Sequence, residues 1–126
     1  MKKGTYYIGD PGYVFDESWE DFLEETEYCE DGIYEYTGEM VCVGKTAYGD
    51  GAYYDMQRRR YAVDSGSLGI LPVSLLEMDN IETVESIKSK CFSHIVEMKE
   101  DFDCNVKNGV FRFGNIVIDT KDDGEE

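Results

Sequence analysis

The chain has 126 residues, of which 28 are acidic and 12 are basic, giving a formal net charge of −16. This length suits one compact domain, and an apolar content of 41% can fill a core, which excludes a globally disordered chain. No apolar run reaches the roughly 18 residues of a membrane-spanning helix, and the basic start lacks a signal-peptide core. We therefore expect a cytoplasmic protein with one domain over 1–120 and an acidic tail over 121–126.

The first half of the chain predicts a strand, a tight turn and an amphipathic helix. Residues 5–8 form the strand, and Gly9-Asp10-Pro11-Gly12 form the turn, because Pro11 pre-sets the φ angle that the turn needs. Over residues 17–28 the apolar side chains recur at helical spacing and the glutamates fall on the opposite face. The apolar face comprises Trp19, Phe22, Leu23 and Thr26.

From residue 33 the period changes to two, which predicts strands. Strands are expected over 33–37 and 40–43, followed by a hairpin whose arms are 46–48 and 52–55 and whose turn is Gly49-Asp50-Gly51. A further strand covers 61–64, and the apolar run 68–73 is expected to be buried.

The second half of the chain predicts more strands. Residues 80–91 fit either a helix or a strand, and 92–98 form a strand. Asn108-Gly109 is a strong hairpin signal between strands 102–107 and 110–113, and 116–119 completes the set. The fold class is α+β, mainly antiparallel, with one or two helices and a sheet that can curl into a barrel-like form.

The acidic residues are concentrated near the predicted helix. Eleven Asp or Glu residues occur from 16 to 39, and no Lys or Arg occurs from Gly4 through Gly44. Like charges at helical spacing cost roughly 0.2–0.5 kcal/mol per pair, so this face tolerates repulsion that a basic partner would relieve. A solvated surface that confers solubility is the alternative interpretation. The candidate partner-binding residues are Glu20, Glu24, Glu25 and Glu27.

Three turns that combine glycine with aspartate form a second candidate site. If the sheet brings the turns together, their aspartates, the nearby tyrosines and the basic run Arg58-Arg59-Arg60 could form a pocket for a small polar ligand such as a nucleotide. The alternative is that aspartate and glycine stand together because turns need both. The candidate ligand-binding residues are Asp10, Tyr13, Tyr48, Asp50, Tyr53, Arg58, Arg60 and Asp64.

The remaining motifs point away from catalysis. Cys29, Cys42, Cys91 and Cys104 lack the paired spacing of a zinc site, so we expect reduced structural thiols, no metal and no cofactor. The single histidine, His94, lies in an apolar strand and is expected to be structural. No catalytic residue is assigned, and a metal-dependent hydrolase built on the aspartate turns ranks last among the possible functions.

Four segments of this chain resemble a family of small uncharacterised proteins found in bacteria, phages and prophages. The segments are Tyr7-Ile8-Gly9-Asp10-Pro11-Gly12-Tyr13, the Tyr48-Gly49-Asp50-Gly51 turn, the Val63-Asp64-Ser65-Gly66 turn and the C-terminal strands from Gly109 to Thr120. Members often carry cysteine where this chain has Gly12, which argues against thiol chemistry at that turn. The resemblance implies a shared fold and a mobile-element setting, and it supplies no activity.

Charge and setting together favour an interaction protein without enzymatic activity. A strongly acidic surface repels nucleic acid and anionic membranes and attracts a basic protein surface. We therefore expect an inhibitor that binds the nucleic-acid-binding surface of a host defence protein, of the anti-CRISPR or anti-restriction type. A small-ligand module using the aspartate turns is the alternative.

Overall fold

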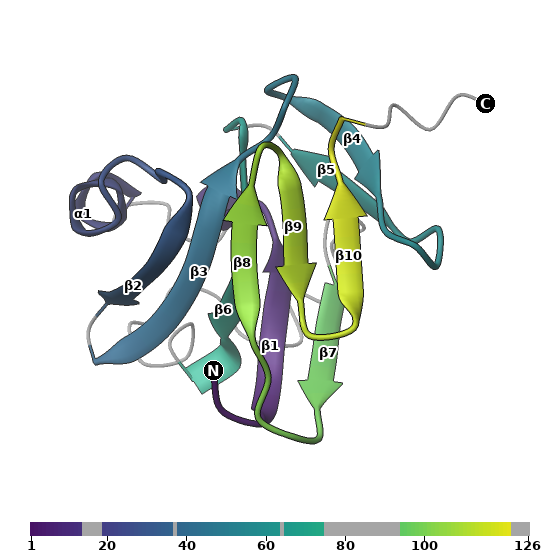
Figure 1. The fold of residues 1–126 in the computed structure, drawn as a ribbon. Helices are drawn as coiled ribbons and strands as arrows, with labels where there is room; N and C mark the ends of the chain where they lie inside the picture. The colour runs from purple at the N-terminus through teal and green to yellow at the C-terminus, as the bar shows by residue number, and fades with distance from the viewer. Residues whose placement is uncertain (14–18, 37, 64, 75–93, 122–126) are drawn as a thin grey trace.

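The computed structural model describes residues 1–13, 19–36, 38–63, 65–74 and 94–121, which form three antiparallel sheets with a helix at one side (Figure 1). The elements in chain order are β1 (Gly4–Gly9), the 3₁₀ turn η1 (Pro11–Tyr13), α1 (Trp19–Glu25), β2 (Gly32–Tyr36), β3 (Glu39–Lys45), β4 (Gly51–Tyr54), β5 (Arg60–Val63), β6 (Ser67–Pro72), β7 (His94–Met98), β8 (Cys104–Lys107), β9 (Val110–Phe113) and β10 (Ile116–Asp119).

The largest sheet has five strands in the order β2-β3-β6-β1-β7. Its centre is β6, which is buried along its whole length, as the apolar run predicts. Ile70 of β6 pairs with Cys42 of β3 on one side and with Ile8 of β1 on the other. The outer strands are β2 and β7, so the residues of β2 form one edge of the sheet.

Alternate residues of the strands supply two separate cores, because successive side chains point to opposite faces of a sheet. On one face Ile8, Cys42 and Ile70 pack against residues of the sheet β10-β9-β8, including Phe111 and Phe113. The three-stranded sheet lies over this face in Figure 1.

The opposite face of the large sheet is covered by α1. Tyr7, Val43 and Leu71 pack here with Phe22 of the helix, and Tyr36 completes the contact at the sheet edge. The Phe22 ring meets Tyr36 edge-on at 5.3 Å between centroids. The apolar face predicted for the helix is therefore the face that packs on the sheet.

The C-terminal hairpin forms as predicted. Lys107 pairs with Val110, and both turn residues have positive φ, 52° at Asn108 and 80° at Gly109. This left-handed backbone matches the twist of the flanking strands, and asparagine and glycine adopt it at least cost. The predicted strand 116–119 is also present, strand 61–64 is confirmed over 61–63, and strand 92–98 is confirmed over 94–98.

The hairpin predicted over 46–55 is wrong. Residues 46–50 form a loop, and β4 pairs with β5, so the turn of this hairpin is at residues 55–59. The reason lies in the side chains: the Thr46 hydroxyl donates to the Gly49 carbonyl at 2.5 Å, and the Asp55 carboxylate accepts the N–H groups of the later turn.

The helix ends earlier than the predicted boundary at residue 28. Glu25 is the last helical residue, and Glu27, Tyr28 and Cys29 all have positive φ, from 52° to 62°. Thr26 stops the helix, because its hydroxyl donates to the Phe22 carbonyl at 2.8 Å and accepts the Cys29 N–H at 3.3 Å.

The α+β class with a mainly antiparallel arrangement is confirmed, whereas the barrel-like curl is not, since the described sheets stay open. Asp64, the ambiguous segment 80–91 with Cys91, and the tail from 122 lie outside the described residues, as does the predicted start of the helix. Within the described part, no helix is long and apolar enough to cross a membrane.

Candidate functional site

The glutamates singled out in the sequence lie on the exposed side of α1 and of the turn after it. Glu20, Glu24 and Glu25 belong to the helix, and Glu27 lies in the left-handed turn. All four are exposed. In the part of the chain that the structure describes, none of these four carboxylates forms an ion pair.

The acidic surface continues from α1 onto the neighbouring edge strand. We call this region the acidic edge; its exposed members are Glu20, Asp21, Glu24, Glu25, Glu27, Glu30, Asp31 and Glu35. α1 and β2 are in contact and lie together at one end of the large sheet in Figure 1. One cation is close by: Lys45 Nζ lies 3.9 Å from a Glu30 carboxylate oxygen, and both side chains are largely exposed.

Apolar side chains are exposed beside these charges. Tyr28 is 63% exposed in the turn after the helix, and Ile33 on β2 and Met40 on β3 are each 45% exposed. Ile33 and Met40 lie on the sheet face that carries Cys42, opposite the face that α1 covers. The acidic edge therefore combines charge with apolar contact area.

The structure brings two of the aspartate turns together through Asp10, which is fully buried. Its carboxylate accepts the Gly12 N–H at 2.7 Å, the Ser65 N–H at 2.8 Å and the Ser65 hydroxyl at 2.6 Å. The Tyr7 hydroxyl donates to the Asp10 carbonyl at 2.7 Å. Asp10 thus holds two turns in place, which is a structural role.

The third turn joins the other two through Thr46. The Thr46 N–H donates to the Gly66 carbonyl at 3.0 Å, and Tyr53 donates its hydroxyl to the Gly49 carbonyl at 2.8 Å. The turns therefore meet, but two of their carboxylates differ in exposure: Asp10 is buried and Asp50 is exposed.

A shallow cavity of about 420 Å³ lies beside the third turn. Its lining is Tyr48, Asp50, Gly51, Ala52 and Tyr53, so three of the candidate ligand-binding residues do come together. Within the described residues that lining includes neither Arg58 nor Arg60. Asp64 and the Tyr13 side chain are outside what the structure describes.

The arginine run is organised by Asp55 in its own hairpin. Arg59 Nε lies 2.7 Å from the Asp55 carboxylate, and the Tyr61 hydroxyl donates to the same oxygen at 2.8 Å. Burial raises the pKa of Asp55, but the bonds from the Arg59 backbone, Tyr61 and the Arg59 side chain together hold that pKa below its usual value. Arg58 and Arg60 stay exposed.

His94 has the structural surroundings expected of it. Its Nε2 lies 2.9 Å from the Arg60 carbonyl oxygen, and its ring meets Tyr61 edge-on at 4.8 Å. Among the described residues, no three His, Cys, Asp or Glu side chains are grouped to hold a metal ion.

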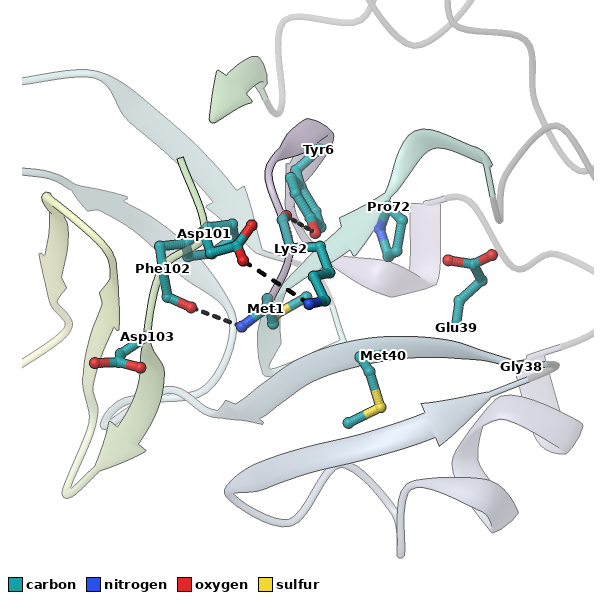
Figure 2. Close-up of a pocket in the computed structure, with 10 residues that line it drawn as sticks. All are labelled: Met1, Lys2, Tyr6, Gly38, Glu39, Met40, Pro72, Asp101, Phe102 and Asp103. Atoms are coloured by element: carbon teal, nitrogen blue, oxygen red, sulfur yellow. Dashed lines mark hydrogen bonds and ion pairs between the residues drawn. The ribbon is translucent and has the colours of Figure 1, made fainter. Parts of the chain in front are cut away.

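A second cavity, bordered by the β3 residues Glu39 and Met40, was not predicted from the sequence. Figure 2 shows this pocket of about 610 Å³, and we call it the N-terminal pocket. Its lining is Met1, Lys2, Tyr6, Gly38, Glu39, Met40, Pro72, Asp101, Phe102 and Asp103. These residues come from four separate stretches of chain, and no local sequence pattern connects them.

The N-terminal pocket is held together by contacts between residues 1–3 and 101–102. The amino group of Met1 donates to the Phe102 carbonyl at 2.6 Å, and the Phe102 N–H donates to the Met1 carbonyl at 2.9 Å. Asp101 accepts the Lys3 N–H at 2.9 Å, and this bond lowers the pKa of the carboxyl, as does the nearby charge of Lys2.

Comparison with protein-family models, with curated proteins and with solved structures finds no match to this chain.

Proposed function

We propose that this protein is a non-enzymatic interaction protein whose acidic edge binds a basic surface of a host protein. The observation that carries the proposal is the set of exposed carboxylates on α1 and its turn, which have no cationic partner within the described residues. Opposite charges across an interface accelerate association and select the partner. A basic partner would relieve the repulsion that the isolated surface bears.

The exposed apolar side chains of Tyr28 and Ile33 would contribute binding free energy that charged side chains alone do not supply. Charged rims set the rate and specificity of association, while a few aromatic and aliphatic side chains supply most of the binding free energy. In this proposal Tyr28, in the turn after α1, and Ile33, on β2, add exposed apolar contacts to those of the glutamates.

The concrete form of the proposal is an inhibitor that covers the nucleic-acid-binding surface of a host defence protein, of the anti-CRISPR or anti-restriction type. Such a surface is rich in lysine and arginine, because it must neutralise phosphates. The phage or mobile-element setting is inferred from the family resemblance described above. The acidic edge supports only the inference that the partner surface is positively charged.

The test is native mass spectrometry of tagged protein purified gently from host lysate, before and after a salt wash. We expect a basic protein to co-purify and to be released by salt. The Debye length, over which charges act on each other, shortens from about 10 Å at 0.1 M to about 3 Å at 1 M ionic strength. The variant Glu20→Lys/Glu24→Lys is expected to lose that partner. The matched control Glu97→Lys/Glu100→Lys changes the same charge at two exposed positions of β7 and the loop after it, and should retain it.

A partner that withstands high salt and binds the Glu20→Lys/Glu24→Lys variant as well as wild type would refute the proposal.

A small-ligand module is the second candidate, and the cavity beside Tyr48, Asp50 and Tyr53 is the observation that favours it. The exposed Tyr48 ring could stack on a nucleobase, and the exposed Asp50 carboxylate could accept a hydrogen bond from it, while the buried Tyr53 forms the wall of the cavity. A nucleotide that binds should then raise the melting temperature progressively with the logarithm of its concentration, and Tyr48→Ala should abolish the rise. An unchanged melting temperature across the panel would remove this candidate.

A further inference from the structure

The floor of the N-terminal pocket is a row of apolar side chains across three adjacent strands. Tyr6 of β1 pairs with Pro72 at the end of β6. On the other side of β6, Ile70 pairs with Cys42 of β3. Met40 and Pro72, each two residues farther toward the same end, therefore lie on the same face. Tyr6 and Pro72 are buried and Met40 is 45% exposed, so the floor is apolar and partly open to solvent.

One wall of the N-terminal pocket rises at the Tyr6 end of this floor and is built from residues 1–2 and 101–103. Two backbone hydrogen bonds between Met1 and Phe102 join these segments. The Phe102 ring meets Tyr6 edge-on, with 5.2 Å between the ring centroids, and the Tyr6 hydroxyl donates to the Lys2 carbonyl at 2.5 Å. The wall is therefore fixed to the floor through Tyr6.

Carboxylates stand at both ends of the floor. Asp101 and Asp103 belong to the wall, and Glu39 lies on the opposite side of Tyr6 (Figure 2). Burial raises the pKa of the Tyr6 hydroxyl, and the negative charges of Glu39 and Asp101 raise it further, so both carboxylates act on the same group. Within the described residues, neither Glu39 nor Asp103 forms an ion pair, and these carboxylates are not grouped to hold a metal ion. Their spacing suits a larger, organic cation.

We propose that the N-terminal pocket binds an alkylguanidinium group, which is a planar cation on an aliphatic stem, as in arginine. Its volume of about 610 Å³ is within the usual range of small-molecule sites, which combine apolar surface with a few polar groups that fix orientation. A guanidinium group is weakly hydrated, packs on aromatic rings and donates hydrogen bonds to carboxylates. Three carboxylates against the charges of Lys2 and the Met1 amino group leave one negative charge, which matches a monovalent ligand.

Lys2 shows that the pocket already accommodates a cation, and its removal gives a signed prediction. Its Nζ lies 3.8 Å from Asp101 Oδ2, and the two side chains are 89% and 61% exposed. An exposed ion pair of this kind contributes little to stability, so the lysine side chain can move aside for a ligand. Replacing Lys2 with glutamine removes a like charge beside the incoming guanidinium and should strengthen binding.

The first test is a titration of the whole protein with N-acetylarginine amide, followed by NMR of isotope-labelled methionine methyl groups. The Met1 and Met40 signals should shift, because both side chains line the pocket, whereas Met56, exposed and outside the lining, should not. N-acetylcitrulline amide, a neutral analogue of the same shape, should bind at least about tenfold more weakly. No shift, an equal shift at Met56 or equal binding of the neutral analogue would overturn the proposal.

Two substitutions with opposite expected effects complete the test. Glu39→Gln should weaken binding at least about fivefold, and Lys2→Gln should strengthen it at least about twofold. The matched control is Glu97→Gln, which changes the charge at an exposed position of β7 outside the pocket lining and should bind like wild type. The melting temperature of each variant verifies that it is folded. Equal weakening by Glu39→Gln and Glu97→Gln, or weaker binding by Lys2→Gln, would contradict the proposal.

Butylguanidinium distinguishes the two sources of such a group. Binding within about threefold of N-acetylarginine amide supports a free small molecule as the ligand, whereas binding at least about tenfold weaker supports an arginine within a polypeptide. This inference goes beyond the proposed function, because the titrations contain no host protein. A lysate experiment that yields no basic partner therefore leaves the pocket proposal intact, and absence of guanidinium binding leaves the acidic edge untouched.

Discussion

The carboxylate of Asp10 accepts both the backbone N–H and the hydroxyl of Ser65, at 2.8 and 2.6 Å, although 55 positions separate the two residues in the chain. This contact joins the turn after β1 to the turn between β5 and β6. Burying a carboxylate completely, as here, costs free energy unless hydrogen-bond donors surround it. The carboxylate of this candidate ligand-binding residue is thus hydrogen-bonded to the protein's own backbone N–H groups and to the Ser65 hydroxyl.

Replacing Asp10 with alanine should destabilise the protein by about 2–4 kcal/mol, because three donors lose a charged acceptor in a buried site. The measurement is urea denaturation at neutral pH. Asp50→Ala is the control, since that side chain is exposed and should change the free energy of unfolding by less than about 0.5 kcal/mol. Equal effects of the two substitutions would contradict the role given to Asp10.

Asp55 should make stability depend on pH in acid. Its pKa is lower in the folded protein than the ordinary value of 3.8, so the carboxylate stabilises the fold fully above that value. The contribution is lost as pH falls below 3.8 toward the folded pKa. Urea denaturation of wild type and Asp55→Asn should therefore differ most at neutral pH, and the difference should shrink below pH 3.8. A constant difference down to pH 2.5 would exclude this linkage.

Gly44→Ala should cost about 1–3 kcal/mol, because the new methyl group overlaps Val106 and crowds Asp31 Oδ1 at 2.7 Å. The check is a double-mutant cycle with Val106→Ala. Removing the valine methyls makes room for the alanine, so the double variant should be more stable than the sum of the two single losses predicts. Strict additivity would show that β8 and β3 are not in this close contact.

Tyr28→Asn should weaken partner binding without loss of stability. The tyrosine ring is 63% exposed, and its backbone has φ of 62°, a conformation that asparagine adopts more readily than tyrosine. Tyr48→Asn is the matched control, because Tyr48 is 66% exposed but lies beside the other cavity. Native mass spectrometry of both variants measures partner binding, and their melting temperatures show whether either substitution destabilises the fold. A partner lost equally with Tyr48→Asn would move the interface away from the acidic edge.

The elements that the sequence predicts correctly depend on neighbours a few residues away. The hairpin at Asn108-Gly109 forms because both residues accept left-handed backbone, and Phe22 and Thr26 are buried because helical spacing puts them on one face. The hairpin predicted over 46–55 is wrong because it was inferred from local residues alone. Glycines at 49 and 51 favour a turn there, but the Asp55 carboxylate accepts the N–H groups of a later turn, so β4 pairs with β5.

Of the candidate sites, the sequence by itself determined the concentration of charge, since eleven acidic residues and no Lys or Arg occur from 16 to 39, the stretch that contains α1 and β2. Only the tertiary structure decided that the Asp10 carboxylate is hydrogen-bonded to Ser65, and that residues 1–3 and 101–102 come together beside a pocket. Those relationships depend on the register of strands and on which sheet faces pack together. Both are set by the sum of many contacts between distant residues, and no short stretch of sequence contains that information.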